Sequence, residues 1–423
     1  MPRRLAILLV ANGYPPESVG GVEQHVQGLA RCLAERGHRV QVYARSGRAD
    51  GEPGTLVEER IDGIPVTRVV YRYEGNRDLR DLYTCNLLDA AFTRHLAGRS
   101  FDVAHVHHFS GISTGIVREL RTRALPCVLT LHDYWLLCPR GQMWHPRGER
   151  CEQVELARCT GCLRSTWPQW PPGGPTEAMV GFVHEHARAV FEDATAVVVP
   201  SARALAPFRA AGLPAARVHV VENGVDVAAL AGIAPPTRAA GAPLRVGYLG
   251  SVIPSKGLAV LIEALHALPS GRAELHVHGN AFPYFEDATY LERALAAMKR
   301  RDAMTYHGAY AAADLPGILA GLDVVAVPAL WNEVFGLTAR EAMAAGRAVV
   351  ASRVGGLQDA LEDGRQGLLV PPGDAQALAA ALHRLALDPE LVARLGRAGR
   401  TRVRSLQAMT DELATLYAGL CRT

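Results

Sequence analysis

Lysine is nearly absent from this sequence, and its scarcity makes one position conspicuous. Only Lys256 and Lys299 occur in 423 residues, so arginine supplies almost all of the basic charge. Together with abundant alanine, this bias is typical of genomic base composition and indicates no function. The formal net charge is only +3, which gives no electrostatic reason to expect nucleic acid as a partner. The setting of Lys256 is therefore the first point to examine.

Long apolar runs are also missing. The first apolar segment, Leu5–Val10, ends at Asn12 and is too short for a secretory signal, so we expect a buried strand there. No stretch approaches the roughly 18 apolar residues that a membrane-spanning helix needs. Eight cysteines are too few for a disulfide scaffold, which favours a reducing compartment. We expect a cytoplasmic protein, and peripheral attachment to the inner face of the membrane stays open.

The alternation of strands and helices predicts two α/β domains. A chain of 423 residues exceeds what one hydrophobic core usually serves. Short apolar runs separated by helical patterns are typical of parallel sheets covered on both faces. In the first half the expected strands are Leu5–Val10, Arg39–Tyr43, Val66–Tyr71, Asp102–His107, Cys127–Leu131 and Ala196–Pro200. In the second half they are Leu244–Leu249, Glu274–His278, Leu322–Val327, Arg347–Ala351 and Gly367–Val370.

A stretch rich in glycine, proline and small residues, Gly232–Pro243, separates the two series of strands. We therefore predict an N-terminal, doubly wound Rossmann-like domain over 1–222, a hinge over 223–242 and a second such domain over 243–400. The two domains are expected to face a central cleft. The remaining segment, 401–423, is predicted to be a helix that packs back on the N-terminal domain.

The expected strand Leu244–Leu249 runs into a glycine-bounded turn, Gly250–Gly257, that carries Lys256 just before a helical pattern. Amides at a helix N-terminus and an ammonium group that face one point form a natural cradle for a diphosphate. The alternative is an ordinary tight turn with a solvated lysine, because short glycine motifs are weak signals. Gly250 and Lys256 are the candidate phosphate-binding residues.

A second strand end carries two glutamates. Leu322–Val327 is followed by Glu333, and Gly336 and Gly346 bracket a predicted helix that contains Glu341. The backbone amides expected to hold a second phosphate are those of Val334, Phe335, Gly336, Leu337 and Thr338. Glu341 would accept hydrogen bonds from ribose hydroxyls, and Glu333 would reach a sugar. Helix glutamates are usually only solvated, but this pair brackets a helix start where ligands of open α/β sheets bind.

These segments closely resemble family 4 retaining glycosyltransferases of the GT-B fold, also described as glycosyl transferase group 1. The two glutamates lie within Trp331–Gly346, which is followed by Gly355 and Gly356. Other matching segments are Gly20–Glu23 with Arg36–His38, Asn223–Asp226 and Gly367–Gly373. The resemblance covers essentially the whole chain. It implies transfer of a hexose-type sugar, with retention of configuration, from a UDP-, GDP- or ADP-sugar to a hydroxyl of a glycan, lipid-linked or small-molecule acceptor.

The resemblance also implies individual roles in the second half. Lys256 would contact donor phosphate, Glu341 would hold the ribose, and Glu333 would lie against the sugar ring. Many members carry an arginine after the glycine that ends the first strand of this domain, where this chain has Ser251. One phosphate contact is therefore missing or comes from elsewhere, and arginines such as Arg203 are candidates.

In the first half, Gly20 and Gly21 begin a helical pattern with apolar positions Val22, Val26, Leu29 and Leu33. Glycines at a helix start allow close approach of backbone to a ligand, although a flexible loop with a glycine cap explains them equally well. The resemblance implies that this loop closes over the donor.

The strand Cys127–Leu131 ends in His132 and Asp133. A lone histidine beside an aspartate is usually structural. The resemblance instead implies that His132 hydrogen-bonds the donor sugar, and that Asp133 orients His132 or touches the acceptor hydroxyl. His107, in the cluster with His105 and His108, is a weaker candidate.

No Asp-x-Asp element in a metal-binding setting follows a strand. We therefore expect Lys256 and helix N-termini, not a catalytic divalent ion, to neutralise the diphosphate. The resemblance implies front-face transfer, in which the donor phosphate helps to deprotonate the acceptor.

Between 138 and 175, Cys, Trp, Pro and Gly replace the periodic pattern, which indicates an insertion without sheet elements. It contains Cys138, Cys151, Cys159 and Cys162, and four thiolates suit tetrahedral zinc or an iron–sulfur cluster. Structural zinc is the favoured interpretation, and four thiols without metal are an alternative. Four protein ligands leave no open position, so we expect no catalysis by the metal.

Two other functions stay open. The same fold could serve a nucleotide-sugar epimerase or hydrolase, or the protein could bind a nucleotide sugar or glycan without catalysis. In the second case the cysteine segment would be an interaction module. The presence together of Lys256, Glu333, Glu341 and His132 favours a transferase.

Overall fold

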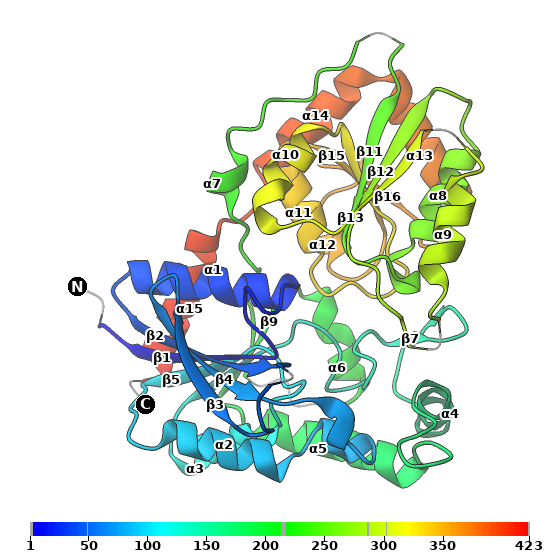
Figure 1. Cartoon of the computed structure of the whole chain (residues 1–423). Helices are drawn as coiled ribbons and strands as arrows, with labels where there is room; N and C mark the ends of the chain where they lie inside the picture. Colours follow the sequence, from blue (N-terminus) through cyan, green and yellow to red (C-terminus); the bar gives the residue numbers. More distant parts are fainter. Residues whose placement is uncertain are drawn as a thin grey trace. The chain divides into compact units, whose positions relative to one another are not determined.

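The computed structural model describes residues 3–48, 50–212, 217–239, 241–285, 287–301 and 303–421 (Figure 1). The chain divides into two compact units. Unit 1 comprises Met1–Gly141, Glu152–Gly224 and Leu406–Thr423, and unit 2 comprises Gln142–Cys151 and Val225–Ser405. Residue 240 of the predicted hinge, and residues 1, 2, 213–216, 422 and 423 of the predicted N-terminal domain and C-terminal helix, lie outside the described residues.

Unit 1 is built on an eight-stranded sheet with the order β10-β9-β6-β5-β1-β2-β4-β3. Its strands are β1 (Ala6–Ala11), β2 (Arg39–Ser46), β3 (Leu56–Ile61), β4 (Ile64–Val70), β5 (Val103–Val106), β6 (Cys127–Thr130), β9 (Ala196–Val199) and β10 (Val218–Val220). All pairings are parallel except that of β3 with β4. Strand β1 is buried at all six positions, as a central strand with helices on both faces must be.

Helices cover both faces of this sheet (Figure 1). One face carries α1 (Gly21–Glu35) and α15 (Leu406–Leu420), and the other carries α2 (Asn86–Leu96), α3 (Gly115–Thr122) and α5 (Glu177–Asp193). The unit also contains α4 (Leu156–Thr166) and α6 (Ala206–Ala210).

The end of the chain completes the core of unit 1. Leu406, Met409, Leu413 and Tyr417 recur at helical spacing on α15 and join the buried cluster that contains Val26, Leu29 and Leu33 of α1. Arg36 donates to the Asp411 carboxylate at 2.5 Å, which ties the end of α1 to α15. Residues nearly 400 positions apart therefore share one apolar interface.

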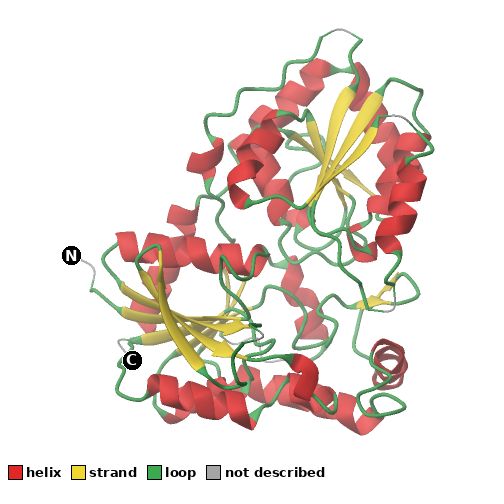
Figure 2. Cartoon of the chain, in the orientation of Figure 1, coloured by secondary structure: helices red, strands yellow, loops and turns green. Residues whose placement is uncertain are grey.

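Unit 2 contains a six-stranded, fully parallel sheet with the order β13-β12-β11-β14-β15-β16. Its strands are β11 (Leu244–Leu249), β12 (Ala273–His278), β13 (Met304–Gly308), β14 (Val324–Val327), β15 (Ala348–Ser352) and β16 (Leu368–Val370). Its helices are α7 (Val227–Leu230), α8 (Leu258–His266), α9 (Tyr290–Met298), α10 (Leu315–Ala320), α11 (Leu337–Ala344), α12 (Leu357–Ala360), α13 (Ala375–Leu387) and α14 (Pro389–Arg400). Figure 2 shows strands enclosed by helices in this unit.

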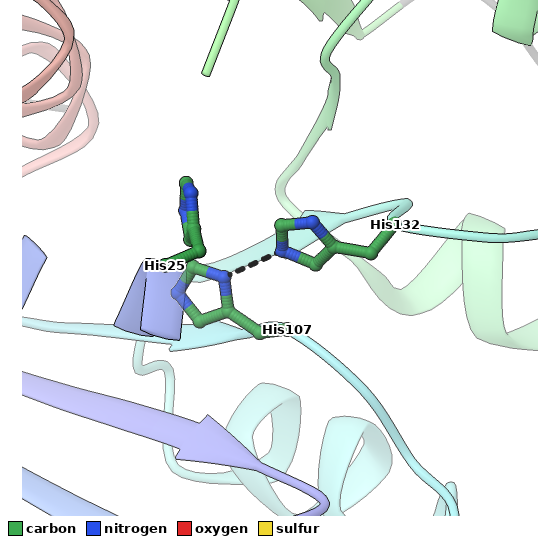
Figure 3. Close-up of side chains that lie close together, drawn as sticks. All are labelled: His25, His107 and His132. Atoms are coloured by element: carbon green, nitrogen blue, oxygen red, sulfur yellow. Dashed lines mark hydrogen bonds between the residues drawn. The ribbon is translucent and has the colours of Figure 1, made fainter. Parts of the chain in front are cut away.

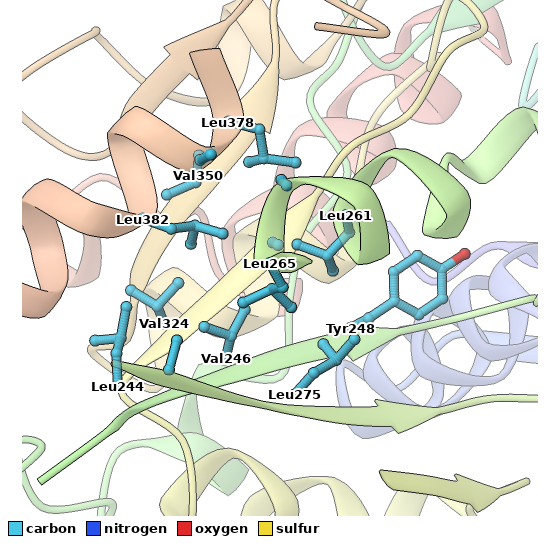
Figure 4. Packing of buried hydrophobic residues seen from close by; sticks show 14 of the residues in the cluster. Leu244, Val246, Tyr248, Leu261, Leu265, Leu275, Val324, Val350, Leu378 and Leu382 are labelled. Carbon is cyan, nitrogen blue, oxygen red and sulfur yellow. The ribbon is translucent and has the colours of Figure 1, made fainter. Parts of the chain in front are cut away.

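The core of unit 2 forms where α8 and α13 pack on the sheet (Figure 4). Leu261 and Leu265 of α8 and Leu378 and Leu382 of α13 meet alternate residues of the strands, among them Val246, Val324 and Val350. All of these side chains are buried, and each fully buried aliphatic side chain contributes about 1.5–3 kcal/mol relative to exposure. This packing fixes the sheet whose edge carries the candidate site.

The predicted strands are present with small shifts at their ends, and three strands of the two large sheets, β3, β10 and β13, were not predicted. Strands β3 and β13 are edge strands whose residues alternate between partial exposure and exposure, so they lack an apolar run. Strand β10 has only three residues. Within the described residues, no helix has both the length and the apolar character needed to cross a membrane.

The prediction that 138–175 contains no sheet element was wrong. A two-stranded antiparallel sheet joins β7 (Trp144–His145) to β8 (Glu149–Arg150), and α4 follows it. Strands of two residues are too short to leave a periodic pattern in the sequence.

Replacing Leu413 with alanine is expected to loosen the α1–α15 interface. The substitution removes a fully buried side chain and should cost about 2–5 kcal/mol. Amide hydrogen exchange in peptides from α1 and α15 should accelerate. The half-buried neighbour Leu416 is the matched control, and its replacement with alanine should have a smaller effect. Equal acceleration in both variants would contradict the assignment of Leu413 to the shared core.

Candidate functional site

The chemistry-bearing residues of unit 2 follow two adjacent strands at the point where the strand order reverses. Strand β11 pairs with β12 on one side and with β14 on the other. A short 3₁₀ turn, Pro254–Lys256, and α8 follow β11, whereas α11 follows β14. In open α/β sheets, ligands bind at the carboxyl ends of strands at such a switch point. The residues that follow β11 and β14 are therefore placed to meet one ligand.

Two glycines allow these strand ends to approach each other. Gly257 has φ +77°, and a Cβ atom there would lie 1.9 Å from the carbonyl oxygen of Pro328. Gly336 has φ +78° and precedes α11, and a Cβ atom there would lie 2.4 Å from Cδ2 of Leu357. A side chain at position 257 would force the segments after β11 and β14 apart, and one at position 336 would force the start of α11 away from α12. The predicted helix start at Gly336 is confirmed.

Lys256 and Glu333 meet directly. The Lys256 ammonium donates to Oε2 of Glu333 at 2.7 Å and lies over the Trp331 ring, 5.0 Å from its centroid. The Trp331 indole N–H donates to the same carboxylate oxygen at 3.1 Å. The Lys256 and Glu333 side chains are 28% and 12% exposed, so solvent reaches the ammonium. The group is held in place yet remains available to an incoming anion.

The loop between β14 and α11 is fixed by its backbone. The Gly356 amide donates to the Glu333 carbonyl at 2.6 Å, and the Leu330 amide donates to the Ser255 carbonyl at 2.8 Å. Side chains of Val334 and Phe335 are buried, which leaves the backbone of this loop as its polar surface. The first-turn amides of α11, which include those of Leu337 and Thr338, have no acceptor within the helix. Free amides at a helix start are suited to an anion, and phosphate binding by them stays a prediction from the sequence.

Glu341 lies in the second turn of α11. Burial raises the pKa of this carboxyl group from its ordinary value of 4.5 to about 7. A carboxyl group poised between its two protonation states near neutral pH is typical of ligand-binding and catalytic positions.

The candidate residues of unit 1 lie at the ends of two adjacent strands. His107 follows β5 and His132 follows β6, and Nδ1 of His107 lies 3.0 Å from Nε2 of His132. Figure 3 shows these two rings linked, with His25 of α1 beside them. The centroid of the His25 ring lies 5.2 Å from that of His107 and 4.8 Å from that of His132. Three imidazoles thus gather at the carboxyl edge of the first sheet.

Burial keeps this cluster neutral. It lowers the pKa of His25 to about 4. The pKa values of His107 and His132 lie well below the ordinary value, because of burial first and of the neighbouring imidazoles second. His105, two residues before His107, bonds both Tyr417 and Thr130 through its ring nitrogens, which anchors the base of the cluster to α15.

Asp133 does not orient His132, so this part of its predicted role was wrong. Its Oδ2 atom pairs with Nε2 of His108 at 3.1 Å, and its Oδ1 atom accepts from the Trp135 amide at 2.9 Å. Burial lowers the pKa of His108, but the charge and hydrogen bond of Asp133 outweigh it and raise the pKa above its ordinary value. Asp133 therefore forms a separate pair, and His107 is the residue that holds His132.

Gly20 and Gly21 lie at the start of α1. The Glu23 carboxylate accepts from Asn12 at 3.1 Å and from Ser18 at 2.9 Å, which shapes the preceding loop. A Cβ atom on Gly20 would lie 2.7 Å from this carboxylate, whereas one on Gly21 would meet nothing within 4 Å. The helix start is thus open at Gly21, where the sequence predicted contact with a ligand.

The predicted zinc or iron–sulfur site at the four cysteines stays a prediction. Cys159 and Cys162 lie one turn apart on α4. Among the described residues, one group of potential ligand atoms is close enough together to hold a metal ion. It consists of His25, His107 and His132, and it includes no cysteine.

Two residues of these sites were not predicted. His25 falls on the apolar stripe of α1, between Val22 and Leu29, and a polar residue on such a stripe is the signal that could have identified it. Gln142 accepts from Ser255 at 2.6 Å and from Tyr284, so it supports the Lys256 turn. No sequence pattern connects residue 142 with residue 255.

Comparison with known proteins agrees with this architecture. Residues 19–229 match the family described as Glycosyltransferase Family 4, and residues 243–388 match Glycosyl transferases group 1. The MMP alpha-(1->4)-mannosyltransferase of Mycolicibacterium hassiacum is 27% identical over 94% of each chain. A D-inositol 3-phosphate glycosyltransferase of an Arthrobacter species is 29% identical over 90% of this chain and 85% of its own.

Solved structures share the fold. Sucrose-phosphate synthase from Thermosynechococcus elongatus is similar with a TM-score of 0.74 and 23% identity over 99% of both chains. The Anabaena protein HepE, in complex with UDP-glucose, has a TM-score of 0.68 and 20% identity over 98% of this chain and 100% of that one.

Two Rossmann-like parallel sheets, each with functional side chains at a carboxyl edge, define the GT-B class of glycosyltransferase. The chain belongs to the family 4, group 1 glycosyltransferases. It is an enzyme that transfers a sugar from a nucleotide-sugar donor.

Replacing Glu341 with glutamine is expected to stabilise the protein at alkaline pH. The pKa of Glu341 lies above its ordinary value, so the folded state binds more protons between pH 4.5 and about 7 and loses stability as pH rises through this window. Glutamine removes the cost of a buried carboxylate, roughly 1–3 kcal/mol at pH 8 after allowance for partial exposure.

Thermal unfolding at pH 5 and pH 8 measures this difference. The gain of Glu341→Gln over wild type should be large at pH 8 and small at pH 5. Glu292→Gln, at an exposed position on α9, is the control and should show no such trend. A gain that does not depend on pH would show that burial does not control the Glu341 carboxyl group.

Proposed function

We propose that the protein is a retaining glycosyltransferase that transfers a hexose-type sugar to a hydroxyl of a glycan, lipid-linked or small-molecule acceptor. The observation that carries the proposal is the group formed by Lys256, Glu333 and Glu341 at the switch point of unit 2. These are the residues to which the family resemblance gives roles on the donor. The cytoplasmic location and peripheral membrane attachment stay predictions from the sequence.

In this proposal the nucleotide diphosphate binds at the ends of β11 and β14. The Lys256 ammonium, which is partly exposed, contacts phosphate together with the amides that begin α8 and α11. Glu341 accepts from the ribose hydroxyls, and a bound ribose would favour its ionised form. Gly250 ends β11 and leaves room for the backbone to approach the phosphates.

Glu333 has a dual role in the proposal. Before the donor binds, its carboxylate shares Oε2 between Lys256 and the Trp331 indole. When phosphate binds, the ammonium donates to it with a further proton and stays paired with Oε2 of Glu333. The second carboxylate oxygen is then turned toward the sugar hydroxyls. The ion pair thus holds both side chains close to the positions that the donor needs, which lowers the reorganisation required on binding.

Unit 1 supplies His132 and Asp133 in this proposal. His132 is neutral at pH 7 and so has one donor and one acceptor nitrogen, which suits hydrogen bonding to a sugar hydroxyl. Asp133, paired with His108, is the candidate contact for the acceptor hydroxyl. Retention follows from the resemblance, which implies front-face attack with the donor phosphate assisting proton removal from the acceptor.

The chemistry is proposed to need no divalent ion on the diphosphate. Fixed charge from Lys256 and the positive ends of α8 and α11 stabilise the departing nucleotide, because these groups are already oriented before the bond breaks. The donor is a UDP-, GDP- or ADP-sugar. HepE, which has this fold, holds UDP-glucose, and this supports a pyrophosphate-linked donor of that type.

Transfer is favoured over epimerisation and hydrolysis, and over binding without catalysis. The full-length relatives are named as a mannosyltransferase and as glycosyltransferases, which supports transfer to an acceptor. Release of nucleoside diphosphate from candidate donors, measured with and without candidate acceptors, tests the proposal. Release that does not depend on any acceptor would favour hydrolysis.

Replacing Lys256 with alanine is expected to lower kcat/KM for sugar transfer by roughly 100- to 1,000-fold, because a fixed positive charge near the departing phosphate is lost. The same variant should lose the thermal stabilisation given by free nucleoside diphosphate. Lys299, an exposed residue at the end of α9, is the other lysine of the chain and is the control for removal of a lysine side chain. Lys299→Ala should keep both properties. Normal nucleotide binding by Lys256→Ala would contradict the assignment of Lys256 as a phosphate contact.

A further inference from the structure

The histidine cluster of unit 1 has the composition and spacing of a transition-metal site. His25, His107 and His132 each offer one ring nitrogen, and the three nitrogens lie within 4.8 Å of one another. Tetrahedral zinc with three imidazole ligands needs nitrogens about 3.4 Å apart, as follows from bonds of about 2.0–2.1 Å. The closest pair here, Nδ1 of His107 and Nε2 of His132, is separated by 3.0 Å. Small side-chain rotations would therefore produce the geometry.

The scaffold around the three rings is rigid. His107 and His132 follow adjacent, hydrogen-bonded strands, and His25 lies on α1, which packs on the same sheet (Figure 3). Beneath them, the His105 ring lies 4.0 Å from that of His107 and has both nitrogens engaged, so it supports the cluster and is not a fourth ligand. Ligands presented by strand ends and a packed helix hold a metal more precisely than ligands on loops do.

The His25 ring has a nitrogen that lacks a partner among the described residues. Its Nε2 atom is buried and makes no hydrogen bond, and the residue is only 8% exposed. Buried polar atoms are nearly always paired, so each exception needs a reason. A purely structural histidine would be expected to use both nitrogens, as His105 does.

We propose that His25, His107 and His132 form a site for a borderline transition-metal ion, Zn²⁺ foremost. Imidazole ligands suit zinc, cobalt, nickel and copper and disfavour magnesium and calcium. Three protein ligands leave the fourth tetrahedral position for water or another ligand. The site is distinct from the four cysteines, and it involves residues of unit 1 alone.

Metal binding would have a consequence for the enzyme, and this consequence rests on the proposed function. A metal that takes the ring nitrogen of His132 removes the group proposed to contact the donor sugar. Zinc would then act as an inhibitor that raises the apparent KM for the donor. The cluster would thus couple transfer activity to the concentration of available zinc.

Titration of the metal-stripped, full-length protein with Co²⁺ alone is the direct test. Tetrahedral cobalt gives visible absorption bands, and coordination by thiolate adds an intense near-ultraviolet band that imidazole does not give. We expect one equivalent of Co²⁺ with visible bands and no thiolate band, and displacement of the cobalt by Zn²⁺. Absence of saturable binding, or a thiolate band from the cysteines, would overturn the proposal.

Variants locate the site. His25→Ala and His107→Ala should each abolish the visible bands, whereas Cys159→Ser and the exposed His219→Ala should retain them. Circular dichroism and thermal unfolding without metal check that each variant is folded, and two independent ligand variants guard against the failure of one. Retention of the bands in both ligand variants would overturn the proposal.

The inhibition assay separates the two proposals. Inhibition by Zn²⁺ that is relieved in His25→Ala would support both the site and the placement of His132 at the donor sugar. Cobalt binding without any effect of zinc on the KM for the donor would leave the metal site established and would count against the proposed role of His132. Loss of nucleotide binding in Lys256→Ala tests the donor assignment without involving the metal.

Discussion

The close approach of Gly257 to the Pro328 carbonyl is the constraint on which the candidate site of unit 2 depends. It brings the segment after β11 against the segment after β14, at the point where the strand order reverses. Only with that approach can the Lys256 ammonium reach the Glu333 carboxylate from a different strand end. This one backbone contact therefore fixes the positions of the ion pair, the Trp331 indole and the start of α11. A residue with a side chain in place of Gly257 would not permit it.

Desolvation plays the corresponding role in unit 1. Burial lowers the pKa values of His25, His107 and His132, so the cluster carries no charge at neutral pH and can form on the edge of an apolar sheet. The same burial leaves Nε2 of His25 and Nε2 of His107 without a hydrogen-bond partner among the described residues. Unit 2 thus presents the fixed charge of Lys256 at its strand ends, whereas unit 1 presents neutral imidazoles that can donate or accept a hydrogen bond.

The sequence was sufficient for the two sheets and for the residues that follow β11 and β14, because both produce local patterns. Parallel strands are apolar runs, and strand-to-helix turns carry glycine, so Lys256, Glu333 and Glu341 could be placed after strand ends from the sequence alone. Edge strands such as β13 could not be predicted, because partial exposure removes the apolar run.

The contact of Lys256 with Glu333 and the pairing of Asp133 with His108 could not be predicted either, because they depend on the side-chain positions of segments that are distant in sequence. His25 was missed because it is a single polar residue on an apolar helical stripe. The spacing of the four cysteines is by itself no evidence of a bound metal.

The near absence of lysine makes the choice of lysine at position 256 informative. In a chain whose basic residues are almost all arginine, a lysine at this position indicates that an ammonium group is required where a guanidinium would not function. Arginine would present a planar fork that pairs with both oxygens of a carboxylate, so it would hold Glu333 in a two-point contact and compete with a phosphate for it. The compact ammonium makes one bond to Glu333, leaves the second carboxylate oxygen uncommitted and rests on the Trp331 ring. Its two remaining protons are directed by rotation about a flexible stem, so it can add a phosphate contact without first releasing the carboxylate. The donor half therefore needs a cation that can be shared, and among the basic side chains of this protein only lysine supplies one.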